Sequence, residues 1–131
     1  MFIDASALCA ILLEEPDAER HAGKMANAPS LLTSHVALFE TVLALARVYG
    51  GDMRAARQDV ADFLQLSKIN VVGIGEAERE LALDAFERYG KGRHPARLNM
   101  GDCFAYACAR THGAPLLFKG DDFSRTDIAV A

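Results

Sequence analysis

Acidic side chains interrupt several apolar segments of this chain. They are Asp4, Glu40, Asp102, Asp121 and Asp122. An ionised carboxylate buried without a partner is costly, and its usual partners are cations or metal ions. The most economical interpretation is one acidic cluster, assembled from distant segments, that holds a divalent metal ion.

Most of these acids also have a local structural explanation. Asp4 could cap a helix that begins just after it. Asp102 follows Asn99 at the spacing of a capping box, and an acid is favoured in the first turn of a helix. Asp121 and Asp122 follow a glycine, as is typical of turns. Taken singly, these residues do not require a metal ion.

Glu40 is harder to explain in this way. It borders the apolar stripe of its helix, so its structural alternative is a buried ion pair with Arg47 or another cation. Clustered oxygen ligands suit hard cations, so Mg²⁺ is expected, with Mn²⁺ as a substitute. One or two ions remain possible, and a pair roughly 3.5–4 Å apart supports phosphodiester hydrolysis.

A basic segment precedes Asp102 in the chain. Its charged residues are Arg88, Lys91, Arg93, His94 and Arg97. Glycines and a proline within it indicate a loop. A solvated surface loop is the simple interpretation. In an otherwise acidic chain we favour a phosphate-binding lip that draws a polyanion towards the acids.

The composition sets the broad class. The chain has 131 residues and a formal net charge of −4, which argues against non-specific nucleic-acid binding by the whole surface. Three cysteines among apolar neighbours are expected to be reduced core residues. Apolar runs are too short to span a bilayer, so we expect a soluble, cytoplasmic protein that does not act at a membrane.

Short apolar segments alternate with helical ones along the chain. Strands are expected at Phe2–Ile3, Leu31–Thr33, Asn70–Val72 and Pro115–Phe118, with a short last one at Ile128–Val130. Helices are expected at Ser6–Leu13, Pro16–Met25, Val36–Val48, Arg54–Leu66, Glu76–Tyr89 and Gly101–His112. This order predicts an α/β fold with a mostly parallel sheet. Sites in such folds lie beyond the carboxyl ends of the strands, where several of the acids fall.

Four segments together resemble a known family. They are the opening Met-Phe-Ile-Asp-Ala-Ser-Ala, the apolar helix with Glu40, the segment Leu-Asn-Met-Gly-Asp-Cys-Phe-Ala-Tyr-Ala at 98–107, and Leu-Leu-Phe-Lys-Gly-Asp-Asp-Phe at 116–123 with Thr126–Asp127. In order and spacing they resemble the PIN domain, and more narrowly the VapC toxins of type II toxin–antitoxin systems. The similarity covers essentially the whole chain. It implies a single PIN-like nuclease domain over residues 1–131, with a central sheet in an α/β/α sandwich.

The resemblance also implies an activity and its partners. It implies a magnesium-dependent ribonuclease that cuts structured RNA such as tRNA. It implies a homodimer neutralised by a cognate VapB-type antitoxin, whose C-terminal tail enters the active-site groove.

The resemblance assigns roles to particular residues. Asp4, Glu40 and Asp102 match metal ligands, Ser6 matches a hydroxyl near the metal, and Asn99 supports the turn at Asp102. Many relatives carry an acid where this chain has Gly120. The fourth ligand is therefore open between Asp122, which we prefer, and Asp121.

Two other functions fit parts of the pattern. One is phosphoryl transfer through an aspartyl phosphate on Asp4, with Lys119 nearby. Asp4-Ala-Ser lacks the second aspartate expected two residues on, which argues against it. The other is a catalytically inactive protein-binding module with the same fold, in which the acids are structural.

Overall fold

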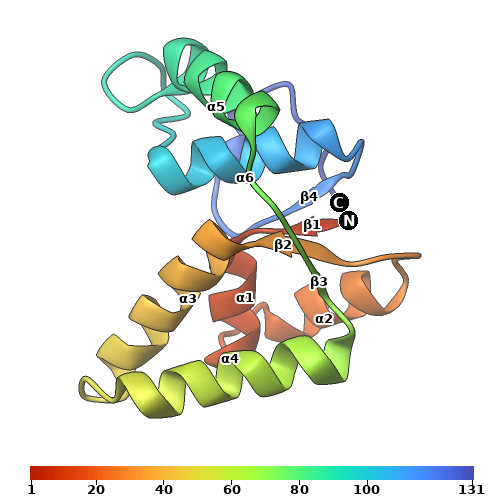
Figure 1. Cartoon of the computed structure of the whole chain (residues 1–131), viewed down its shortest axis with the longest axis vertical. Helices are drawn as coiled ribbons and strands as arrows, with labels where there is room; N and C mark the ends of the chain where they lie inside the picture. Colours follow the sequence, from red (N-terminus) through yellow and green to blue (C-terminus); the bar gives the residue numbers. More distant parts are fainter.

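A parallel sheet divides the molecule into two helical layers (Figure 1). The computed structural model describes residues 1–131, and its four strands lie in the order β3-β2-β1-β4. They are β1 (Phe2–Ile3), β2 (Leu32–Ser34), β3 (Asn70–Val72) and β4 (Leu116–Leu117). All neighbouring strands are parallel. The expected α/β/α architecture is confirmed.

Helices cover both faces of the sheet. They are α1 (Ala5–Leu12), α2 (Ala18–Ala26), α3 (His35–Val48), α4 (Met53–Ser67), α5 (Glu76–Tyr89) and α6 (Met100–Thr111), followed by the short 3₁₀ helix η1 (Phe123–Arg125). Helices α1 to α4 form one layer, and α5 and α6 form the other (Figure 1). None of the helices has the length and apolar character needed to cross a membrane.

The strand register explains how two short strands support two layers. Phe2 pairs with Leu116, and Ile3 pairs with Leu117. Side chains alternate between the faces of a strand. Phe2 and Leu116 therefore enter the core beneath α5 and α6, whereas Ile3 and Leu117 pack with Leu8 of α1. All four strand residues are at most 1% exposed, so the sheet is buried on both faces.

Side-chain caps set the starts of four helices, and the cap of α6 is Asn99. Asp4 accepts from the Ser6 N–H at the start of α1, and Ser34 accepts from the Ala37 N–H at the start of α3. Asp52 caps α4. Since β2 ends at the same Ser34 that caps α3, the chain passes from strand to helix without a loop.

Two expected elements differ from the observed ones. Pro16 lies outside α2, because it occupies the second position of a turn closed by the Ala18 N–H and the Glu15 carbonyl at 2.8 Å. Proline is favoured at that turn position. The expected strand at Ile128–Val130 is only an isolated bridge, in which Val130 pairs with Leu116.

Candidate active site

The acids of the predicted cluster lie at the carboxyl edge of the sheet. Asp4 directly follows β1, and Asp122 comes after β4. Glu40 lies on α3, which begins where β2 ends, and Asp102 lies in the first turn of α6. Parallel strands bring their carboxyl ends to one edge, so four distant segments converge there.

Asp4 is the most buried of these acids, with 4% of its surface exposed. One of its carboxylate oxygens accepts from the Ser6 N–H at 2.9 Å and from the Ser6 hydroxyl at 2.5 Å. Burial raises the pKa of Asp4, the hydrogen bonds from Ser6 oppose the rise, and the charge of Asp122 adds to it. The same Ser6 hydroxyl accepts from the Lys119 N–H at 3.0 Å, which links Asp4 to the segment after β4.

Asp102 is held by a reciprocal pair of hydrogen bonds with Asn99. The Asn99 N–H donates to the Asp102 carboxylate, and the Asp102 N–H donates to the Asn99 side-chain oxygen, both at 2.9 Å. Burial raises the pKa of Asp102 to about 7, and the charges of Asp4, Asp122 and Glu40 add to the rise. The hydrogen bond from the Asn99 N–H opposes it. The capping arrangement and the acidic cluster therefore coexist at this residue.

Glu40 has no hydrogen bond or ion pair to hold its carboxylate. The alternative of a buried pair with Arg47 is not found, because the ion pairs of the protein lie elsewhere. Partial burial, followed by the charge of Asp4, raises the pKa of Glu40. Its carboxylate lies against the α-carbon of Gly101, where a β-carbon would overlap both oxygens. The sequence interpretation missed Gly101, although a glycine directly before Asp102 was a visible signal.

Asp121 and Asp122 are both exposed but differ in their relation to the cluster. Burial is the largest cause of the raised pKa of Asp4 and of Asp102. The charge of Asp122 is a further cause in both cases, whereas Asp121 contributes to neither. The Asp121 carbonyl accepts from the Ser124 hydroxyl at 2.6 Å, within its own turn. Asp122 therefore acts electrostatically on Asp4 and Asp102, whereas Asp121 does not.

The four acids have the chemistry of a cation site, since they are hard oxygen donors without a positive partner. As the side chains stand, no three His, Cys, Asp or Glu residues converge closely enough to hold a metal ion. Binding would require the carboxylates to turn towards one another. The nearby Lys119 ammonium does not neutralise them, because it pairs with Glu15 and lies 3.8 Å from Asp17. That pairing also removes the support that Lys119 gave to an aspartyl phosphate on Asp4.

The basic segment forms a loop between α5 and α6, pinned where Gly90 bridges to Leu98. Lys91, Arg93 and Arg97 are exposed on it. His94 packs edge-on against Tyr89 with ring centroids 5.3 Å apart. The loop stands on the side of the molecule where α6 begins (Figure 1).

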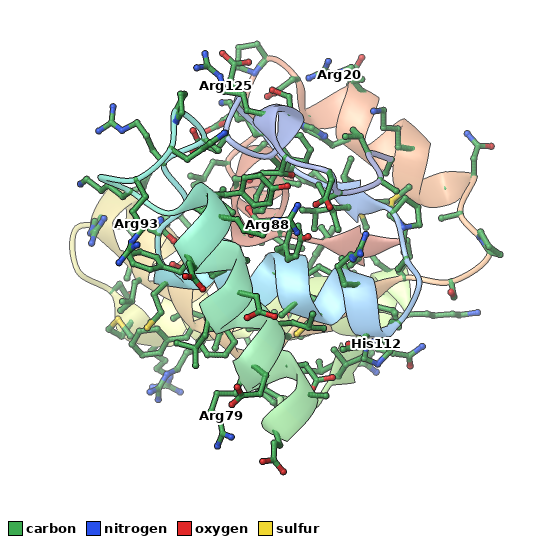
Figure 2. The ribbon with its side chains drawn as sticks, turned by 90° about the horizontal axis from the view of Figure 1, so that it is seen from above. Arg20, Arg79, Arg88, Arg93, His112 and Arg125 are labelled. Atoms are coloured by element: carbon green, nitrogen blue, oxygen red, sulfur yellow. The ribbon has the colours of Figure 1, made fainter.

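Arg88 differs from the rest of the basic segment. Its guanidinium donates to Asp127 at 3.1 Å and to the Tyr89 hydroxyl at 2.6 Å. Asp127 also accepts from the Tyr106 hydroxyl at 2.7 Å. Figure 2 shows Arg93 at the rim of the molecule and Arg88 over its middle. Arg88 therefore ties α5 to the C-terminal segment, a role that the sequence interpretation did not foresee.

A shallow apolar surface borders the acids. A hollow of about 480 Å³ is lined by Glu40 together with Val36, Phe39, Leu43 and Met100, among others. Met100 also lines a smaller hollow with Leu83 and Phe86. Phe39, Leu83 and Met100 are each at least 60% exposed, so α3, α5 and α6 share an unpartnered apolar face beside the site.

Comparison with known proteins agrees with this architecture. The model of the PIN domain family matches residues 1–129. Ribonuclease VapC of Mycolicibacterium smegmatis is 41% identical over 130 residues, covering 99% of this chain and 98% of that relative. The crystal structure of Mycobacterium tuberculosis VapC20, described as a Sarcin-Ricin loop cleaving toxin, is similar with a TM-score of 0.78 at 20% identity, covering 99% of this chain and 97% of that one.

A toxin–antitoxin complex from Klebsiella pneumoniae gives a TM-score of 0.71 at 19% identity, covering 99% of this chain and 95% of that one. At these sequence identities the two solved structures support the assignment of the fold alone. The family assignment rests on the full-length relative and on the family model. The chain therefore belongs to the PIN domain family and, within it, to the VapC ribonucleases.

Proposed function

We propose that this protein is a metal-dependent endoribonuclease toxin that hydrolyses phosphodiester bonds in structured RNA such as tRNA. The observation that carries the proposal is the set of four acids at the carboxyl edge of the sheet. They have no cationic partner, and burial together with their mutual repulsion raises the pKa of Asp4, Glu40 and Asp102. Membership of a family whose relatives are named ribonucleases supports it. Residues 1–131 would act as a single nuclease domain, in the cytoplasm.

Asp4, Glu40, Asp102 and Asp122 would hold Mg²⁺, or Mn²⁺ in its place. When bound, the ion would supply a more acidic water and neutralise charge on the phosphate. Ser6 and Asn99 would hold Asp4 and Asp102 through the hydrogen bonds described above. Hydrolysis would leave a 5′-phosphate and a 3′-hydroxyl.

The basic loop would bind the RNA backbone. Lys91, Arg93 and Arg97 have exposed ammonium or guanidinium groups suited to phosphate contacts. His94 is partly buried against Tyr89 and would contact RNA by its exposed edge. Arg88, already engaged by Asp127, would contribute chiefly by fixing the base of the loop.

We further propose a homodimer and a VapB-type antitoxin. The face around Phe39, Leu83 and Met100 exposes apolar side chains beside Glu40, so pairing two copies through it would bring two active sites into one groove. Light scattering after gel filtration should give the mass of a dimer for the native protein and of a monomer for Phe39→Glu. A wild-type monomer would refute this part of the proposal.

The central test incubates the purified, antitoxin-free protein with total tRNA and Mg²⁺, followed by sequencing of the cut ends. We expect cuts at few positions, their loss with a chelator, and their loss in Asp102→Asn. Asp84→Asn, which removes an exposed carboxylate from α5, serves as the matched control and should cut normally. Cleavage by Asp102→Asn at the native rate would refute the proposed site.

A binding-only protein is the alternative outcome. In that case neither the native protein nor Asp84→Asn would cut any RNA, and Mn²⁺ would leave the melting temperature unchanged.

A further inference from the structure

Gly101 occupies a place on α6 where the helix itself does not need a glycine. It lies between the cap Asn99 and Asp102, in the first turn, and its φ is not in the left-handed region. Alanine forms helices more readily than glycine, so backbone conformation gives no reason for a glycine here. The reason must lie in what surrounds the α-carbon.

The atoms that surround it belong to Glu40. The three nearest atoms to a β-carbon built on Gly101 are the two carboxylate oxygens and the carboxyl carbon of Glu40, all at distances that real side chains do not allow. The Glu40 carboxylate thus fills the space of a missing side chain. Gly23 provides the contrast, because it lies inside α2 and a β-carbon there would meet nothing within 4 Å.

The Glu40 carboxylate lies against Gly101 without a polar partner. No hydrogen bond or ion pair fixes it, in contrast to Asp4 with Ser6 and Asp102 with Asn99. Glu40 lies in the second turn of α3 and Gly101 in the first turn of α6, and these two helices pack against each other. The separation of Glu40 from Asp102 therefore depends on how closely α6 allows the carboxylate to approach its backbone.

We propose that Gly101 is a positioning residue for the metal centre. By lacking a side chain it lets the Glu40 carboxylate lie against α6, beside Asp102, so that both acids can reach one ion. The inference rests on the proposed metal site, and it adds a residue outside the four acids that determines metal affinity. Any side chain at this position would push Glu40 towards the apolar hollow that it borders.

The test measures Mn²⁺ binding to the metal-free, full-length protein by isothermal titration calorimetry. Gly101→Ala should weaken Mn²⁺ binding by roughly 10- to 100-fold, as is usual when a group that orients a ligand is removed. The matched control is Gly23→Ala, which adds the same methyl group to open space and should bind Mn²⁺ like the native protein. Native affinity in Gly101→Ala would overturn the proposal.

A rescue variant separates positioning from a general packing defect. Glu40→Asp withdraws the carboxylate by one methylene and should weaken binding when made alone. In the Gly101→Ala background the same change should instead restore part of the affinity, and part of any reduced thermal stability, because it relieves the overlap. If Glu40→Asp only adds to the defect, the overlap is not its cause and the proposal fails.

Failure of the proposed function would look different. In that event the native protein itself would bind Mn²⁺ no better than Asp102→Asn, and Gly101 would lose its proposed role with the site. If the native protein binds Mn²⁺ and Gly101→Ala binds it equally well, the metal site stands and only the role of Gly101 is overturned.

Discussion

The Ser6 hydroxyl lies 2.5 Å from a carboxylate oxygen of Asp4, on the buried side of the acidic cluster. Through the same oxygen atom it accepts from the Lys119 N–H. A single hydroxyl therefore orients the most buried acid and joins the start of α1 to the segment that leaves β4.

Ser6→Ala should weaken both the fold and the metal site. Removing a donor from a buried carboxylate is expected to lower the free energy of unfolding by about 1–3 kcal/mol and to raise the pKa of Asp4 further. Mn²⁺ should then bind more weakly, because more of Asp4 is protonated. Urea unfolding and calorimetry check these effects. Ser67→Ala, at a serine whose hydroxyl makes no hydrogen bond, should change stability by less than about 0.5 kcal/mol.

The metal-free protein should lose stability as the pH rises from about 4 to about 7. The pKa of Asp102 is raised from 3.8 to about 7 in the folded state, so the folded protein binds a proton that the unfolded chain has already released. Its unfolding free energy therefore falls across this interval and levels off above it. Asp102→Asn should remove the part of this slope that Asp102 causes, whereas Asp4 and Glu40, whose pKa values are also raised, keep the rest, and the variant should be more stable than the native protein at pH 8 by roughly 1–3 kcal/mol.

Thermal melts at several pH values in the presence of a chelator measure the slope. Asp84→Asn keeps Asp102 and should retain the native slope. A native protein whose melting temperature rises steadily between pH 4 and pH 7 would contradict the prediction.

Substitutions of the neighbouring acids Asp121 and Asp122 should have different effects on Mn²⁺ binding. Asp122→Asn is expected to weaken Mn²⁺ binding by about tenfold or more, since it removes a charge that acts on both Asp4 and Asp102. Asp121→Asn should bind like the native protein. Calorimetric titration of the two variants side by side measures the difference, and a larger effect in Asp121→Asn would reverse the assignment.

The exposed cations of the basic loop should act on RNA affinity rather than on cleavage chemistry. Replacing Lys91, Arg93 and Arg97 together by alanine should weaken RNA binding equally for different RNA sequences. The slope of log affinity against log salt concentration should fall in magnitude by about 1 for each phosphate that is no longer neutralised. Filter binding of tRNA by Asp102→Asn protein over a range of salt concentrations gives the slope. A variant that replaces the exposed Arg20 of α2 and the exposed Arg54 and Arg57 of α4 by alanine loses the same three charges and controls for net charge. An equal reduction in both variants would assign the effect to total charge alone.

Arg88→Ala should behave unlike the other changes in the basic segment. Its pair with Asp127 is about half exposed, so removing it should cost no more than about 1 kcal/mol of stability. The salt slope of RNA binding should stay close to that of the native protein, because the Arg88 guanidinium is already engaged. The same salt titration tests this, and a reduced slope would show that Arg88 binds phosphate directly.

Local signals in the sequence were enough to predict most of the elements. Ser34 and Asp52 cap the helices predicted at Val36–Val48 and Arg54–Leu66, and such starts are predictable because a cap is decided by residues that are neighbours in the chain. Pro16 misled the prediction of α2, since the same fixed φ suits the first turn of a helix and the second position of a β-turn. Which of the two forms depends on the Glu15–Ala18 hydrogen bond, a detail outside any simple pattern.

Tertiary contacts were harder to predict than the acids themselves. Acids at strand ends are visible because parallel strands place them at one edge. The approach of Glu40 to Gly101 depends on how α3 and α6 pack, and the Asp127 hydrogen bonds depend on where the C-terminal segment returns. The sequence spacing between such residues carries no information about these distances.

The order of the strands has a consequence for synthesis of the protein. β1, made first, is flanked in the sheet by β4, which is made near the end. Asp4 can therefore meet Asp122 only after almost the whole chain has left the ribosome. A nascent or prematurely terminated chain would lack both the edge of the sheet and one acid of the proposed metal site, so it could not act as the proposed nuclease before its synthesis is almost complete.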